Sequence, residues 1–344
     1  MEKITNRAGE KVPLTQVFQA LDRRLARRPI VWETFRIRVC GRLLELCFED
    51  RDMRDAAMRS VQSHVVQEAG TPDAVFFYWY GVSTEILPEE MTQRPGVWES
   101  RDDTGLLKVS EAQMYGVDTV RRHFYFTRQK PDTVDYAVYG HTLVGLVSRW
   151  ASESDLILLH AAAVGAGGKG VLVVGRGGSG KSTFSVSCMT EGMDFVSDDY
   201  TLISASGSLR AMPIYTTVAV NPDMYARLPS LGEPSVPPDA EWCNGKLQFF
   251  IPGERFAPEL EIGAVVMPVI GPDDGEPAIR PIAPGAAMVQ MLHTSAIQVS
   301  RNRDAALVRQ MAQRLSGLPV YEMRMSRDLK KNPAALRRFI EKEL

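Results

Sequence analysis

The residues best suited to chemistry lie in the stretch GRGGSGKST, residues 175–183. Its first eight residues match the pattern G-x-x-x-x-G-K-S/T, in which glycines let backbone N–H groups turn toward phosphate oxygens. The lysine would contact the β- and γ-phosphates, and the serine would offer its hydroxyl to Mg²⁺. We therefore expect a nucleotide polyphosphate site made by Gly175, Gly177, Gly178, Ser179, Gly180, Lys181, Ser182 and Thr183.

The segments on either side of this stretch agree with that expectation. The apolar run 170–174 predicts a strand, and the spacing of Phe184, Val186 and Cys188 fits a helix that begins at Lys181. A helix N-terminus adds its positive dipole end to a phosphate site. The glycines would thus form the turn between a strand and a helix.

Two adjacent acids, Asp198 and Asp199, follow the apolar residues of DFVSDDYTLI. Neighbouring strand residues point to opposite faces, so one carboxylate would meet Mg²⁺ or its waters and the other an acceptor hydroxyl. A helix cap or a turn is the alternative. The carboxyl ends of strands are where α/β sheets bind ligands, which favours the functional interpretation.

The histidines and the downstream basic residues are less specific. His160 closes the apolar stretch LILLH, and its spacing alone fits a structural role as well as a catalytic one. Lys246 and Arg255 would either clamp the transferring phosphate or be exposed surface charges. Four further histidines lack carboxylate or cysteine partners nearby in the sequence, and we expect structural roles for them: His64, His123, His141 and His293.

Residues 1–135 predict an N-terminal α+β domain without a catalytic motif. Helical spacing of apolar residues predicts a helix within 14–28, and alternation predicts a hairpin within 35–50 with its turn at Gly41. A second helix is expected from 52 to Gly70, then a buried strand over 74–80 and more strands within 107–128.

Residues 136–344 predict an α/β catalytic domain, because strands here alternate with a helix. A helix over 136–154 leads into it, and helices around a strand at 319–325 end it. The Pro/Gly-rich stretches 228–242 and 271–285 predict long loops, which would be either lids over the site or plain connectors.

The composition excludes several classes of protein. The 344 residues are 44% hydrophobic and 24% charged, with 40 Lys and Arg against 42 Asp and Glu. This balance gives no electrostatic case for binding nucleic acid or an anionic membrane. The four cysteines show no zinc or disulfide spacing. No apolar run approaches the ~20 residues of a membrane span, and no signal peptide is expected at the N-terminus, so we expect a cytoplasmic protein.

The order LLHAAAVGAGGKGVLVVGRGGSGKSTFSVSCMTEGMDFVSDDYTLI resembles the catalytic domain of the HPr kinase/phosphorylase family. That family has a histidine before the phosphate loop, then G-x-G-K-S, a helix, a glycine and a strand that ends in Asp-Asp. The resemblance covers residues 150–205 well and implies a P-loop kinase core of the HPr kinase/PEP carboxykinase-like type. The matching positions here are His160, Gly180, Lys181, Ser182, Gly192, Asp198 and Asp199.

The resemblance implies that ATP and Mg²⁺ occupy the loop and that a serine hydroxyl of a protein receives the phosphoryl group. Asp198 and Asp199 would divide the metal contact and the work of a base. We favour Asp198 as the base and Asp199, with Ser182, as the metal contact. His160 would contact the phosphate or the acceptor. The family also suggests a homo-oligomer.

One family signature is missing. The stretch that comes nearest to the Glu-Ile-Arg-Gly-Leu-Gly strand of the bifunctional members is LEIGAVVMPV, residues 260–269, and it lacks the arginine and the glycine spacing. We therefore expect no phosphorylase activity.

Three functions remain open at this point. The first is a kinase for a protein or peptide serine, such as that of a lasso-peptide precursor, with the N-terminal domain recognising the substrate. The second is a kinase for a small hydroxyl metabolite such as free serine. The third is a nucleotide-dependent regulatory switch without phosphotransfer, against which a second aspartate argues mildly.

Overall fold

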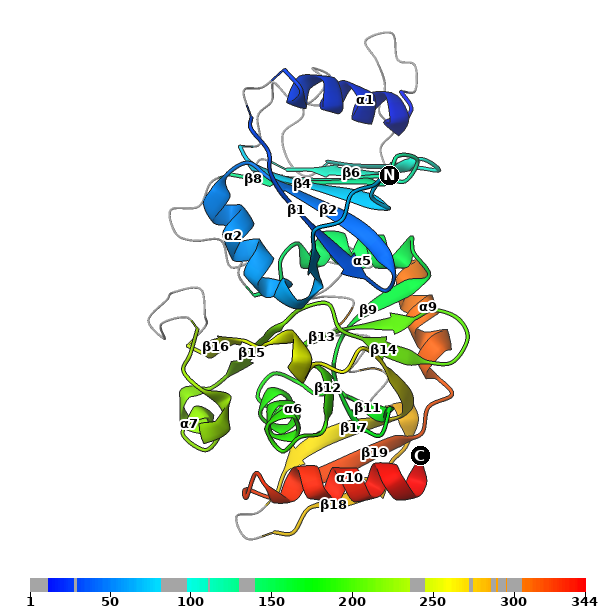
Figure 1. Ribbon diagram of the computed structural model, residues 1–344. Coiled ribbons are helices and arrows are strands. Elements are labelled where there is room, and N and C mark those ends of the chain that lie inside the picture. The colour runs from blue at the N-terminus through cyan, green and yellow to red at the C-terminus, as the bar shows by residue number, and fades with distance from the viewer. Residues whose placement is uncertain are drawn as a thin grey trace. The chain divides into compact units, whose positions relative to one another are not determined.

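The computed structural model describes residues 12–27, 30–81, 98–110, 112–129, 140–235, 245–271, 275–285, 289, 295 and 305–344. The chain divides into two compact units (Figure 1). Unit 1 contains Met1–Met58 and His64–Val138, and unit 2 contains Arg59–Ser63 and Tyr139–Leu344. Both units combine helices with a large mixed sheet, as expected for an α/β protein.

Unit 1 is built on a sheet whose described strands run in the order β3-β1-β2-β4-β8-β7-β6-β5. Strands β2, β4 and β8 are mutually parallel neighbours, and the other pairs are antiparallel. The strands are β1 (Glu33–Val39), β2 (Arg42–Phe48), β3 (Val65–Val66), β4 (Ala74–Tyr80), β5 (Trp98–Asp102), β6 (Gly105–Val109), β7 (Gln113–Asp118) and β8 (His123–Arg128).

The hairpin predicted within 35–50 is confirmed as β1 and β2. Its two turn residues, Cys40 and Gly41, have φ of 50° and 75°, which suits the two-residue turns that match strand twist. Helix α1 (Leu14–Leu25) also lies where the spacing predicted it. Its buried residues pack on Trp79, Leu107 and Tyr125 of the sheet because one face of the helix is apolar.

The second predicted helix is shorter than expected. Helix α2 (Arg51–Ser60) is followed by the 3-10 turn η1 (Gln62–His64) and by β3, which pairs with β1. The prediction of a helix to Gly70 was wrong here because Val65 and Val66 are β-branched and find a partner strand. That partner is distant in the chain, so the local pattern does not reveal it.

Unit 2 contains a mixed sheet with the described order β12-β10-β11-β17-β14-β13-β9, and β17 also pairs with β19. The pairs β11–β17 and β17–β19 are parallel, whereas β10 is antiparallel to both neighbours. The strands are β9 (Leu156–His160), β10 (Ala162–Ala166), β11 (Lys169–Val173), β12 (Asp194–Ser197), β13 (Tyr200–Ser204), β14 (Arg210–Met212), β15 (Thr217–Val220), β16 (Leu247–Phe250), β17 (Leu260–Ile270), β18 (Ala278–Pro281) and β19 (Val320–Met325).

Both faces of this sheet are covered, because alternate residues of β11 point into two different cores. Val171 and Val173 join a core with α6 and α10, whereas Leu172 joins one with Met311 of α9. Strands β15 and β16 form a separate antiparallel hairpin. The helices and 3-10 turns of unit 2 are α5 (Val144–Ser152), α6 (Lys181–Thr190), α7 (Pro222–Tyr225), α9 (Ala305–Leu315), α10 (Lys331–Glu343), η2 (Pro229–Leu231) and η4 (Gly253–Arg255).

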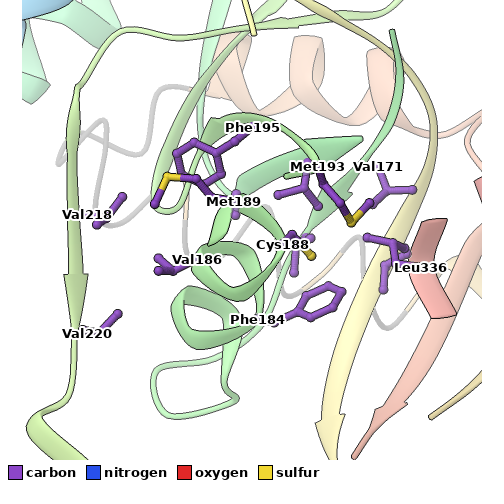
Figure 2. Close-up of a cluster of buried hydrophobic side chains, with 14 of the residues drawn as sticks. Val171, Phe184, Val186, Cys188, Met189, Met193, Phe195, Val218, Val220 and Leu336 are labelled. Atoms are coloured by element: carbon purple, nitrogen blue, oxygen red, sulfur yellow. The ribbon is translucent and has the colours of Figure 1, made fainter. Parts of the chain in front are cut away.

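Helix α6 is enclosed by apolar side chains. Figure 2 shows Phe184, Val186, Cys188 and Met189 of this helix within one buried cluster, which also includes Val171 of β11. The cluster is completed by residues of β12, β15, α10 and the turn before β12, namely Phe195, Val218, Val220, Leu336 and Met193. A helix enclosed by core residues has little freedom to shift, so its N-terminus is held in a fixed place.

Several predicted segments have a more precise outcome. The helix expected over 136–154 is α5, and residues 136–139 of that prediction lie outside the described part. Cys243 lies outside it as well. The stretch 271–285 is not a bare loop, because it contains β18, which pairs with β19. Of the stretch 228–242, residues 236–242 lie outside the described part. In the described parts of the chain, no helix has the length and hydropathy needed to cross a membrane.

Candidate functional site

The glycine-rich stretch forms the turn between β11 and α6. The loop leaves the sheet after Val174, whose N–H donates to the Val266 carbonyl at 3.0 Å, and α6 begins at Lys181. Gly178 and Gly180 have φ of 80° and 88°, a region that favours glycine. At Gly175 an added Cβ would lie 2.2 Å from Ser179 Oγ. The turn therefore needs glycine for its conformation and for close packing.

This loop has polar groups that an anion would satisfy. Ser179 Oγ is buried and has no hydrogen-bond partner among the described residues. Gly180 is the N-cap of α6, and within the described part of the chain no side chain caps the helix there. Ser182 and Thr183 are half-buried in its first turn. An uncapped helix N-terminus beside an unpaired hydroxyl fits a phosphate group.

Asp198 lies between β12 and β13 and is 3% exposed. Its Oδ2 accepts a hydrogen bond from Ala219 N on β15 at 3.2 Å. Burial, reinforced by the negative charge of Asp199, raises the pKa of Asp198 to about 7, against the lowering effect of Lys181. This carboxyl group can therefore gain or lose a proton near neutral pH.

Asp199 has the opposite electrostatic character. Its Oδ1 lies 2.9 Å from Lys181 Nζ and 2.6 Å from His160 Nε2. Burial by itself would raise the pKa of Asp199, but the charges of Lys181 and His160 and the hydrogen bond to His160 lower it well below the ordinary value. Asp199 is thus held as a carboxylate. Adjacent carboxyl groups with separated pKa values are typical of sites that combine a base with a fixed charge.

His160 joins the loop to the acidic pair. Its Nε2 lies 3.3 Å from Lys181 Nζ as well as beside Asp199, and its Nδ1 is buried without a partner among the described residues. Its backbone N–H donates to Ser295 Oγ at 3.0 Å. The pairing of β9 with β13 places His160 opposite Tyr200, the residue that follows Asp199 in the sequence. This register brings His160 beside the acidic pair.

His141 also lies at this site, although the sequence predicted a structural role for it. Its Nε2 is 3.9 Å from Asp199 Oδ2, the oxygen that Lys181 and His160 do not contact. The ring lies 4.6 Å from that of Tyr200 and 5.1 Å from that of Tyr215. Burial lowers the pKa of His141 to about 4, so the ring is neutral at pH 7.

The backbone around His141 is anchored on both sides. Tyr215 Oη donates to the Thr142 carbonyl at 2.8 Å, and Thr217 Oγ1 donates to the Gly140 carbonyl at 2.8 Å. Only the tertiary fold brings these groups together, because β9 and β12 intervene in the chain between His141 and Asp199. No local spacing in the sequence would have identified His141 or the two tyrosines.

The basic residues downstream have different positions. Lys246 is exposed, and its charge lowers the pKa of both Asp198 and His141, so it lies on the side of the site where these two residues are. Arg255 instead donates to the Met189 carbonyl at 3.2 Å, at the end of α6 opposite the loop. Its position does not fit a phosphate clamp. His293 lies outside the described residues.

The chain's own groups would only partly surround a metal ion. In the described ranges, no cluster of three or more His, Cys, Asp or Glu side chains could hold one. Ser182 and Asp199 are the predicted oxygen ligands. Mg²⁺ usually takes one or two protein ligands and completes its shell with phosphate oxygens and water, so this donor set fits Mg²⁺ bound with a nucleotide.

Comparisons with known proteins do not identify a family for this chain. No protein-family model matches the chain, and no curated protein matches it. Among solved structures, it is similar to the Hpr(Ser) kinase/phosphatase from Coxiella burnetii, at 13% identity over 50% of this chain and 88% of that one. The TM-score is 0.28. Because so low a score carries no argument, the functional assignment depends on the geometry of the site.

Proposed function

We propose that this chain transfers the γ-phosphoryl group of ATP to a hydroxyl group, with Mg²⁺ bound beside the phosphates. The observation that carries the proposal is the meeting of Lys181, His160 and the two aspartates at the end of the glycine loop. A nucleotide site alone needs no buried acid with a pKa near 7. A phosphotransferase can use one as the base that accepts the proton of its acceptor hydroxyl.

In the proposed reaction, Asp198 accepts the proton of the acceptor hydroxyl, whose oxygen forms a bond to the γ-phosphorus of ATP. The bond between that phosphorus and the β–γ bridging oxygen breaks, and ADP leaves. Lys181 and the N–H groups of the loop neutralise and orient the phosphates. Mg²⁺ would add further charge neutralisation, held by Ser182 and Asp199.

A serine of a protein or peptide is the acceptor that we favour, in an HPr kinase-like reaction without the phosphorylase activity. Unit 1 would recognise such a substrate, because its mixed sheet ends in strands that a peptide strand can extend. Free serine and other small hydroxyl compounds are the alternative acceptors.

The test is transfer of radiolabel from γ-labelled ATP to serine-containing peptides and to free serine, with Asp198→Asn and Asp199→Asn beside the wild type. Both variants should lose transfer. Asp223→Asn is the matched control, because Asp223 is exposed on α7, and it should keep full activity. Full transfer by both site variants would refute the mechanism. Binding of ATP without transfer to any acceptor would favour a regulatory switch.

A further inference from the structure

An apolar surface lies beside the glycine loop at the ends of β17 and β19. Ile270 is 57% exposed, although it follows the buried residues of a central strand. Its Cγ1 lies 4.0 Å from the position a Cβ would take at Gly180, and Met325 Cε lies 2.7 Å from that position. Ile270 and Met325 are register partners in the parallel pair β17–β19. Their side chains therefore lie next to each other and next to the start of α6.

The loop rests along the same face of β17. Pro268 shares this face with Ile270, since the two are separated by one residue, and its Cδ lies 3.8 Å from the Cβ position at Gly175. Pro268 is buried, whereas Ile270 extends past the loop and stays exposed. Val269 is 43% exposed but points to the opposite face. Among the described residues of β17, Ile270 is thus the apolar side chain that borders the loop and remains open to a ligand.

The sheet order tells which end of a nucleotide this surface would meet. The loop follows β11, and the acidic pair follows β12, which lies on one side of β11 beyond β10. Strands β17 and β19 lie on the other side. With neighbouring strands roughly 5 Å apart, β12 and β17 lie about 15 Å apart, which is close to the span from the γ-phosphate to the base of an extended nucleotide. An extended nucleotide whose γ-phosphate lies at Asp198 would therefore place its base near Ile270.

We propose that Ile270, supported from beneath by the buried Met325, is the platform on which the purine base of the bound nucleotide stacks. This inference rests on the proposed function. A purine face is apolar and flat, and an exposed branched aliphatic chain fits it by area without directional contacts. Such a platform contacts the flat face of the base and makes no hydrogen bonds to its edge. Because adenine and guanine differ only at the edge, ATP and GTP bind with similar affinity. Two side chains are too few for a stable protein interface, which needs about 800 Å² from each partner.

The experiment compares two probes on Ile270→Asn by calorimetry in the presence of Mg²⁺. ATP contains the base, whereas inorganic tripolyphosphate does not. The dissociation constant for ATP should rise about tenfold, and so should that for GTP, while the constant for tripolyphosphate stays unchanged. Ile270→Leu keeps the apolar area and should bind ATP as the wild type does. Val120→Asn changes a different exposed aliphatic residue, 63% exposed in unit 1, and should alter no dissociation constant.

Each contrary result has a separate meaning. An unchanged ATP constant in Ile270→Asn would overturn the platform, and so would equal weakening of ATP and tripolyphosphate, which indicates a disturbed loop. A change of molecular mass on sedimentation would assign Ile270 to self-association instead. If the wild type binds neither probe, the proposed function itself falls. Thermal unfolding of each variant verifies that the fold is intact.

Discussion

Replacing Asp198 with asparagine should stabilise the protein at alkaline pH while abolishing phosphotransfer. The pKa of Asp198 is raised to about 7 in the folded chain from an ordinary 3.8, so the folded state binds the proton more tightly than the unfolded state. Stability from this group is complete below pH 4 and is lost as the pH rises through 7. Asparagine resembles the protonated form of Asp198 and can still accept the hydrogen bond from Ala219. Because asparagine does not ionise, the stability of the variant is not reduced in this way as the pH rises.

The magnitude follows from the same two pKa values. Between pH 5 and pH 7 the free energy of unfolding of the wild type falls by about 1.36 kcal/mol per pH unit relative to that of Asp198→Asn. The total difference is about 3 kcal/mol, and it stays nearly constant up to pH 8. Urea unfolding of both proteins at pH 5 and pH 8 measures this difference directly. His141, whose pKa is lowered to about 4, makes the fold more stable as pH rises to 6.5, but it does so in both proteins and cancels.

Asp199→Asn is the contrasting variant. Its carboxylate is held by Lys181 and His160, so its stabilising contribution is present above pH 4 and its removal should destabilise the fold at pH 8. The reasoning would be refuted if Asp198→Asn lowered the free energy of unfolding by the same amount at both pH values. Equal effects of the two asparagine variants would refute it as well.

Three other perturbations have defined outcomes. Lys181→Met should lower the free energy of unfolding in urea by about 2 kcal/mol, because it removes the cation that pairs with Asp199. Calorimetry should show no ATP binding by this variant. Stability equal to that of the wild type would contradict the ion pair. His141→Phe keeps the ring packing but removes the nitrogen near Asp199, so kcat should fall about tenfold with KM for ATP unchanged in a steady-state assay; an unchanged kcat would remove His141 from the site. Gly165→Ala should lower the free energy of unfolding by about 3 kcal/mol in thermal unfolding, because the added Cβ would lie 2.2 Å from a backbone oxygen. Gly207→Ala, at φ of 66° with open space around it, should lower the free energy of unfolding by only about 1 kcal/mol. Equal losses in the two variants would contradict the steric argument.

The parts of the fold that local physics controls were predictable. Helix α1 and the hairpin of β1 and β2 follow from the periodicity of their apolar residues, and the loop before α6 follows from its glycines. The end of α2 was not predictable, because Val65 and Val66 leave the helical pattern only by pairing with β1. Long-range pairing also makes β17 the neighbour of β11, β14 and β19.

The candidate site divides in the same way. Lys181, His160, Asp198 and Asp199 stand out in the sequence because their spacing matches a known arrangement, and the structure brings them together. His141 has no such spacing, and it reaches Asp199 because Tyr215 and Thr217 anchor its backbone. Arg255 shows the converse, since a basic residue at a plausible distance in sequence lies at the far end of α6. Their roles in catalysis stay predictions.

The ion pair of Lys181 with Asp199 has a kinetic consequence for the proposed reaction. Lys181, the cation assigned to the phosphates, pairs with Asp199, the carboxylate assigned to Mg²⁺, directly beside the proposed base Asp198. Phosphates that attract Lys181 would loosen its hold on Asp199, so the acceptor half becomes competent only after the donor has arrived. The order of addition is then compulsory, with ATP first and the hydroxyl substrate second. An acceptor analogue should accordingly inhibit uncompetitively against ATP.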